Sequence, residues 1–192
     1  MKYEFTGETK LYLGITLKRI RATAAIEKFN VAVGDLGGWI EDEKNLAQSG
    51  DAWVSGNAQV SCDAEVYGNA QVYGDAWVSG DARVCGNARV FGNALVSGDA
   101  WVSGDANVSG NAEVYGDKIE KENDLINITS NAGSYNITIT QNHIKIGCQY
   151  HSKTAWFKIT ENKIRKMDGQ KAVDWWKTWK PILISICDGL KQ

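Results

Sequence analysis

The stretch GNAQVYGDAWVSGDARVCGNARV, residues 68–90, repeats a six-residue unit of the form [Asn/Asp]-Ala-x-Val-x-Gly. The unit recurs eleven times over residues 51–117 without an insertion, with an alanine and a valine in every copy. Its one departure at the glycine position is Cys62. A short period kept this strictly indicates an architecture in which successive units stack on one another.

The unit itself predicts a short strand followed by a tight corner. Alternation along an extended chain sends the alanine and the valine to one face and the residue between them to the other. Glycine, asparagine and aspartate tolerate positive φ, so the remaining positions can turn the chain. Repetition would coil the chain into a prism with alanine and valine inside. Because both side chains are small, the interior should be narrow and packed, without a ligand cavity.

The tryptophans recur at a different spacing from the coil. The heptapeptide GDAWVSG occurs at 50–56, 74–80 and 98–104, so its copies start four units apart. If three units make a coil, each tryptophan lies one coil along and one face round from the last. A coil of four units would instead stack the tryptophans. We expect three units in each coil, and therefore no aromatic stripe.

Three units in each coil also predict which outward-facing residues lie above one another, in columns that run along the solenoid. One column reads Glu65, Arg83 and Trp101, which allows a cross-coil ion pair and a cation–π contact. Four outward residues are candidates for a face through which copies self-associate: Trp77, Leu95, Arg83 and Trp101. An acidic column at one corner is expected to be solvated and to cap turn amides; it comprises Asp63, Asp81, Asp99 and Asp117.

Charge and composition limit the partners. Residues 51–117 carry two basic and nine acidic side chains, a net charge of −7, whereas residues 118–192 carry twelve basic and seven acidic, a net charge of +5. Duplex nucleic acid is therefore not an expected partner. The sequence has no apolar run long enough for a membrane span, no apolar signal at its start, and widely separated cysteines. These features predict a cytoplasmic protein without a membrane partner.

The two flanking segments differ from the repeat. Residues 1–50 predict a small N-terminal β cap and a lead-in, with strands at 2–7 and 14–22 and with Trp39 and Ile40 covering the apolar end of the coil. Residues 118–192 predict a small α+β module. It has a β-hairpin within 125–147 and helices over 152–168 and 170–190, the second kinked or restarted at Pro181. The fold class is thus mainly β.

The repeat resembles the hexapeptide-repeat β-helix family, in which an aliphatic residue precedes a small one by four positions. That resemblance implies a triangular solenoid and favours a left-handed coil over the right-handed coil of bactofilin-type proteins. The segments YEFTGET, LKRIRA and GDLGGWIE, together with the repeat, resemble a protein family encoded in phages and prophages of Gram-positive bacteria. This second resemblance implies an origin and a host cytoplasm, but no activity.

Chemical signatures are sparse. Residues 51–117 contain no histidine, although the hexapeptide acyltransferases need a histidine base there, so we expect no catalytic residue and no enzyme activity. Cys148 and His151 supply only two potential zinc ligands, and no metal or cofactor is expected. In the C-terminal module, an aromatic and basic set could combine base stacking with phosphate contacts. The set comprises His151, Lys153, Trp175, Trp176, Lys177, Trp179 and Lys180.

These observations predict a non-enzymatic phage-type binding protein, homo-oligomeric and trimer-like by analogy with its relatives. It would interfere with a host process, as a counter-defence protein does, by binding a host protein or by sequestering an anionic signalling nucleotide. Two alternatives stay open: a filament-forming solenoid like a bactofilin, and an enzyme that acts on a nucleotide through the C-terminal module.

Overall fold

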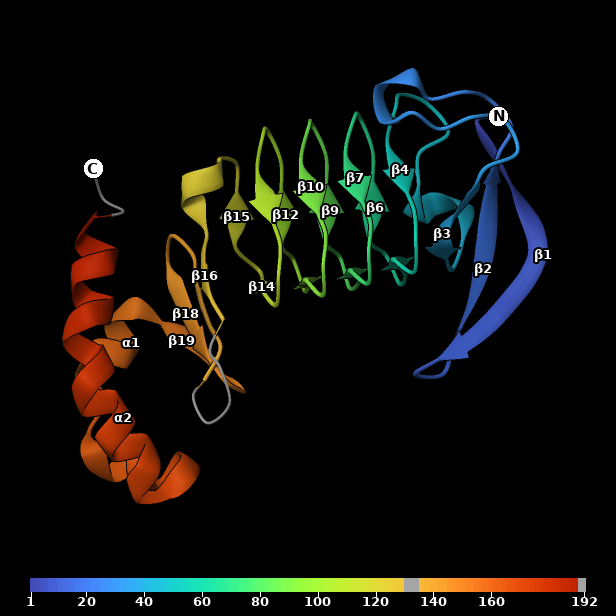
Figure 1. The fold of residues 1–192 in the computed structure, drawn as a ribbon. Helices are drawn as coiled ribbons and strands as arrows, with labels where there is room; N and C mark the ends of the chain where they lie inside the picture. The colour runs from blue at the N-terminus through green and yellow to red at the C-terminus, as the bar shows by residue number, and fades with distance from the viewer. Residues whose placement is uncertain (130–134, 190–192) are drawn as a thin grey trace.

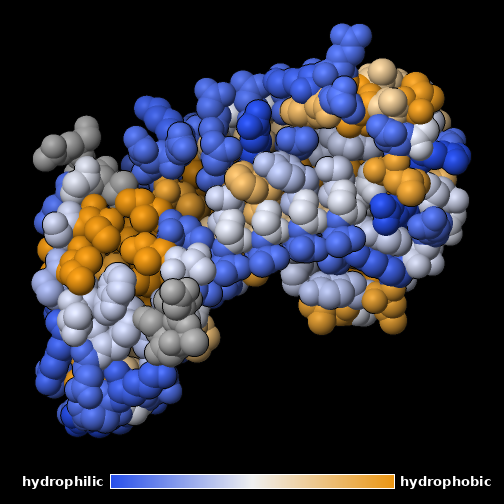
Figure 2. Space-filling view, in the orientation of Figure 1, coloured by the Kyte–Doolittle hydropathy of each residue, from blue (hydrophilic) through white to orange (hydrophobic). Residues whose placement is uncertain are grey.

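A computed structural model describes residues 1–129 and 135–189 (Figure 1). It is mainly β, with a β-solenoid of about four turns between an N-terminal group of strands and a C-terminal module that contains the helices. Figure 2 shows hydrophobic side chains gathered mainly at the two ends of the molecule, while the solenoid between them presents mostly pale and blue residues.

The solenoid has three parallel sheets, each named here after its tryptophan. The Trp53 face contains β4 (Trp53–Val54), β7 (Gln71–Val72), β10 (Arg89–Val90) and β13 (Asn107–Val108). The Trp77 face contains β5 (Gln59–Val60), β8 (Trp77–Val78), β11 (Leu95–Ser97) and β14 (Glu113–Tyr115). The Trp101 face contains β6 (Glu65–Val66), β9 (Arg83–Val84), β12 (Trp101–Val102) and β15 (Lys118–Ile119).

The strand register confirms that three units make a coil. Trp53 pairs with Gln71, Gln59 with Trp77, and Glu65 with Arg83, and each partner lies three units further along the chain. The three repeated tryptophans therefore lie on three different faces, as predicted. The last strand pair differs. β15 places Lys118 beside Trp101, and the separation of the two residues along the chain is one residue short of three full units.

The solenoid interior consists of the repeat's alanines and valines, and each of them is at most 1% exposed. This confirms the alternation derived from the unit. Leu46 and Ile119 occupy the equivalent interior positions at the two ends, and both are fully buried. The core is thus one continuous apolar column.

The corners depend on positive φ. Gly86 has a φ of 69°, and a Cβ built there would lie 2.8 Å from the backbone nitrogen of Gly104 in the next coil. Coils can therefore approach at this corner only if the side chain is absent. Cys62 adopts the same conformation, with a φ of 58°.

The N-terminal strands extend the Trp77 face. β1 (Tyr3–Tyr12), β2 (Ile15–Ala22) and β3 (Leu36–Ile40) pair antiparallel, and β3 then runs parallel to β5. Short 3₁₀ turns η1 (Glu27–Phe29) and η2 (Glu43–Asn45) flank β3. Ile40 is fully buried at the end of the core, as expected. The prediction for Trp39 was wrong: it aligns with outward-facing Gln59, beneath Lys10 and Arg19.

The C-terminal module begins after the 3₁₀ turn η3 (Glu122–Asp124). Its antiparallel sheet has four strands where a hairpin was predicted: β16 (Ile126–Ile128), β17 (Ile137–Ile139), β18 (His143–Ile146) and β19 (Gln149–Ser152). The helices are α1 (Lys153–Lys158) and α2 (Glu161–Gly189). The backbone of α2 departs from helical geometry at Asp168 and Gly169 and is helical around Pro181, so the helix restarts after Gly169 and not at Pro181.

A buried carboxylate joins the module to the last coil. Asp117 is 3% exposed and accepts hydrogen bonds of 2.8 Å from the hydroxyls of Thr140 and Tyr150, and His143 Nδ1 lies 2.8 Å from its other oxygen. This corrects the expectation that the acidic corner column is solvated throughout. Asp63, at the other end of that column, forms an ion pair with Lys44 at 2.6 Å.

Candidate ligand-binding site

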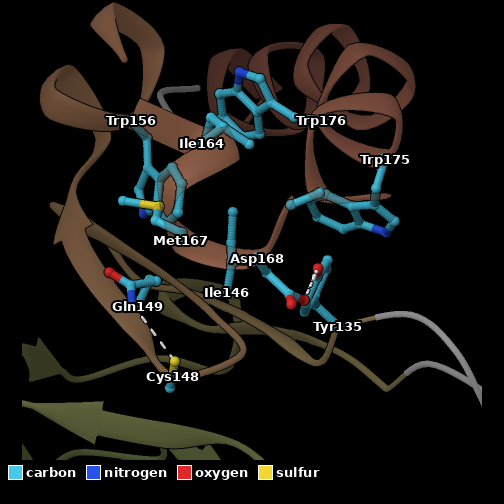
Figure 3. Close-up of a pocket in the computed structure, with 11 residues that line it drawn as sticks. Tyr135, Ile146, Cys148, Gln149, Trp156, Ile164, Met167, Asp168, Trp175 and Trp176 are labelled. Carbon is cyan, nitrogen blue, oxygen red and sulfur yellow. Dashed lines mark hydrogen bonds between the residues drawn. The ribbon is translucent and has the colours of Figure 1, made fainter. Parts of the chain in front are cut away.

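A pocket of about 320 Å³ opens between the four-stranded sheet and α2 (Figure 3). Its size is at the lower limit of pockets that hold small organic ligands. Most of its lining is aromatic or aliphatic. The lining residues are Tyr135, Ile146, Cys148, Gln149, Trp156, Ile164, Met167, Asp168, Ala172, Trp175 and Trp176.

Two glycine turns shape the pocket. Gly147 has a φ of 55° and turns β18 into β19, and its α-carbon faces the ring of Tyr135 so closely that a Cβ would lie 3.1 Å away. Gly169 has a φ of 68° and forms the break in α2 next to Asp168. The first turn brings Cys148 and Gln149 to the rim. The second turn, at Gly169, places Asp168 outside regular helical geometry and at the rim of the pocket.

Aromatic rings pack against one another to form the walls. The Trp175 ring meets Tyr135 edge-on at 5.0 Å and stacks on Trp179 at 5.4 Å between centroids. Trp156 and Trp176 lie 5.3 Å apart across the other side. Trp156 is also fixed by a hydrogen bond of 2.7 Å from its Nε1 to the carbonyl of Ile144. Trp156 and Trp176 are only 2% and 4% exposed, so they form a rigid back wall, and Trp175 is the partly exposed tryptophan of the lining.

The polar part of the lining is small. The Tyr135 hydroxyl donates a hydrogen bond to Asp168 Oδ2. Burial, and after it this hydrogen bond, raises the pKa of Tyr135 to about 12, so the phenol stays a donor at neutral pH. Asp168 is the one residue with a formal charge among the lining residues. The pocket thus presents aromatic faces and one carboxylate.

The structure brings some of the predicted residues together and separates others. Trp175 and Trp176 line the pocket, and Trp179 supports Trp175 from outside the lining. None of the predicted lysines is in the lining. Lys177 pairs with Glu161 at 3.4 Å, Lys180 Nζ lies 5.9 Å from the Trp176 ring centroid, and Lys153 begins α1.

His151 supports the wall of the pocket from behind. Its ring meets Trp156 at 5.2 Å, and its Nε2 is buried with no hydrogen-bond partner among the described residues. Burial, and to a lesser degree the positive charge of Lys163, lower the pKa of His151 below its ordinary value. We therefore expect a neutral imidazole at physiological pH.

Sequence reasoning missed Tyr135, Trp156, Met167 and Asp168. Trp156 had a usable signal, since it lies in the only other tryptophan-containing segment of the module. The pair Asp168–Gly169 is also a turn signal within an otherwise helical segment. Tyr135 reaches the pocket only through strand pairing, which spacing along the chain does not reveal.

The candidate self-association residues lie on two faces of the solenoid. Trp77 and Leu95 are neighbours on the Trp77 face, where Tyr12 covers Trp77 edge-on at 5.3 Å. Arg83 and Trp101 are neighbours on the Trp101 face, and Trp101 is 41% exposed. The cation that lies over Trp101 is Lys118, at 4.8 Å.

Comparisons with known proteins concern the repeat. A family model described as the YdcK beta solenoid repeat matches residues 64–80, 70–86, 82–98 and 88–104, in overlapping windows. No curated protein matches the chain. Over residues 1–129 and 135–189, no helix combines the length and the apolar character that crossing a membrane requires. The same residues contain no group of three potential metal ligands.

Proposed function

We propose that this is a binding protein that captures a small anionic nucleotide in its C-terminal module. The observation that carries the proposal is the aromatic pocket between the sheet and α2. Stacking of a base on aromatic side chains contributes about 1–3 kcal/mol per base. The pocket volume of about 320 Å³ accommodates one nucleobase better than a whole oligonucleotide.

The charge distribution supports the same assignment. The module carries a net charge of +5 and the solenoid −7, so an anion is attracted to the module and repelled by the repeat. Because Asp168 is in the lining, the base rather than the phosphate would enter the pocket. Lys177 and Lys180 lie on the same helix as Trp176 and could meet the phosphate outside it.

In this proposal the solenoid is a rigid spacer with a closed interior. Its two ends are covered by the protein's own strands, β3 at one end and the C-terminal sheet at the other. Covered ends disfavour end-to-end polymerisation. Self-association would then use a side of the prism, and the Trp101 face offers an exposed tryptophan.

The resemblance to phage-encoded proteins suggests where nucleotide capture would act, which is in the bacterial host of the phage. A protein that holds a signalling nucleotide without converting it lowers the free concentration of that signal in the host. This would make the protein a counter-defence component.

Native mass spectrometry of the full-length protein, purified directly from bacteria, tests the proposal. We expect a retained mass of nucleotide size that is released unchanged on denaturation. Trp175→Ala should lose it, whereas Trp101→Ala on the solenoid should keep it. A wild-type protein that carries nothing, and binds nothing when mixed with cell nucleotides, would contradict the proposal. Release of a converted product would favour the enzyme alternative.

One observation favours a host protein as a second target. At the tip of the β1–β2 hairpin, Leu11 at the end of β1 and Leu13 in the turn are 75% and 72% exposed. With Tyr12, which is 40% exposed, they form a continuous exposed apolar segment, and exposed apolar patches mark sites of protein contact. If they bind a host protein, Leu11→Ser with Leu13→Ser should abolish its co-purification and leave nucleotide retention unchanged.

A further inference from the structure

The pocket's one carboxylate narrows the choice of base. Asp168 stands at the rim because the backbone of α2 breaks there, with a φ of −152° at Asp168 and a φ of 68° at Gly169. An ionised carboxylate only accepts hydrogen bonds. A ligand group placed against Asp168 must therefore present N–H donors, and a group that presents carbonyl or ring-nitrogen acceptors is repelled.

One oxygen of this carboxylate is already oriented. The Tyr135 hydroxyl donates to Oδ2, and the Tyr135 ring is itself held edge-on against Trp175. No hydrogen bond joins a described residue to Oδ1, and a carboxylate oxygen has two lone pairs. The carboxylate can thus receive two further parallel donors in a fixed direction, beside the aromatic walls (Figure 3).

The four common bases differ in what they offer at the Watson–Crick edge. Guanine presents two adjacent donors there, N1–H and the N2 amino group, which match the two oxygens of a carboxylate. Adenine and cytosine each place a ring-nitrogen acceptor beside their amino group, and uracil flanks its single N–H with two carbonyls. Asp168 is an exposed carboxylate at the rim of the aromatic pocket, and it favours guanine because only guanine offers two adjacent donors to its two oxygens.

We infer that the site selects a guanine nucleotide, with the base against the partly exposed Trp175 and its N1–H and N2 amino group on Asp168. This inference rests on the proposed function and names the base. The phosphate then points away from the Asp168 carboxylate, out of the pocket. The Gln149 amide, on the sheet side of the pocket, is a further polar contact for the base.

Titrating the full-length protein with GMP, AMP, CMP, UMP and IMP tests the inference, with tryptophan fluorescence excited at 295 nm or calorimetry as the readout. GMP should bind at least about tenfold more tightly than AMP, CMP or UMP. IMP keeps N1–H but lacks the N2 amino group, so its affinity should lie between those of GMP and AMP.

A variant that gains affinity for a different nucleotide must be folded, so its loss of GMP affinity cannot be due to misfolding. Asp168→Asn should weaken GMP about tenfold and strengthen XMP, because the asparagine amide can donate to the carbonyl that xanthine carries in place of the N2 amino group. Asp174→Asn is the matched control, since Asp174 is an exposed carboxylate on the same helix, bonded to Gln170. It should change neither affinity.

The outcomes separate the two claims. If no nucleotide binds to the wild-type protein, the proposed function fails. If nucleotides bind without preference for guanine, or if Asp168→Asn leaves the GMP to XMP ratio unchanged, the guanine assignment fails while nucleotide capture stands.

Discussion

Single residues at the corners decide whether the coils can stack. In the left-handed conformation a side chain costs about 1–2 kcal/mol relative to glycine, and Cys62 adopts that conformation with a φ of 58°. Replacing it with glycine also loosens the unfolded chain, at a cost of about 0.4–1 kcal/mol. The first effect is larger, so Cys62→Gly should stabilise the protein by about 0.5–1 kcal/mol in urea unfolding. An unchanged or lowered midpoint would contradict this account of the corners.

Substitutions at two glycines distinguish the cost of positive φ from the cost of a steric clash between coils. Gly116 has a φ of 72° and nothing near its α-carbon, whereas a Cβ on Gly86 would meet the backbone of Gly104 at 2.8 Å. Gly116→Ala should cost about 0.5–1 kcal/mol, because the cost of positive φ, about 1–2 kcal/mol, is partly offset by about 0.4–1 kcal/mol from the stiffer unfolded chain. Gly86→Ala should cost clearly more, because the coils must separate to make room. Equal losses for the two variants in the same urea titration would show that contact between coils is unimportant there.

His151 should make stability depend on pH. Its pKa in the folded protein is lowered, mainly by burial, so the unfolded chain binds this proton more readily. Where the unfolded state binds more protons, stability rises with pH. Stability should therefore fall as the pH drops from about 7 through the unfolded pKa of about 6.5 and toward the lower folded value. His151→Gln should lose this part of the slope between pH 7.5 and 5.5. The same slope in both proteins would refute the assignment.

At the scale of elements, one carboxylate holds the C-terminal sheet on the solenoid. Asp117→Ala removes the acceptor for two hydroxyls and the partner of His143, all at 2.8 Å. At about 1 kcal/mol for each lost contact, the variant should lose about 3 kcal/mol and become open to proteolysis near residues 118–126. Asp99→Ala, an exposed member of the same column, should change stability by less than about 0.5 kcal/mol. Equal protease resistance of the two variants would contradict this role.

The elements also show what a sequence can predict. The solenoid strands follow from the period-two alternation of alanine and valine, because each strand pairs with a neighbour of the same pattern. The module lacks such a repeat, so its pairing depends on contacts between residues far apart in the chain, such as Tyr135 with Asp168. Trp175 and Trp176 were recognisable as aromatic candidates. Asp168 was not, because its position at the rim comes from a break in a helix.

At the scale of the molecule, the account predicts a closed oligomer formed through the side of the prism. Trp101 is 41% exposed and carries Lys118 over its ring, whereas Trp77 is covered by Tyr12. Trp101→Glu should therefore lower the oligomer mass in sedimentation analysis, and Gln71→Glu on the Trp53 face should leave it unchanged. Filaments in electron micrographs of the wild-type protein, or an oligomer indifferent to Trp101→Glu, would contradict this prediction.

In the proposed function the solenoid is a scaffold and the C-terminal pocket captures the ligand. The most direct test is the ¹H–¹⁵N spectrum of the eight tryptophan indole N–H groups, recorded during addition of GMP, AMP, CMP and UMP in equal amounts. The account predicts shifts for Trp156, Trp175 and Trp176, and none for the solenoid tryptophans. An unchanged spectrum, or shifts confined to Trp53, Trp77 or Trp101, would contradict it.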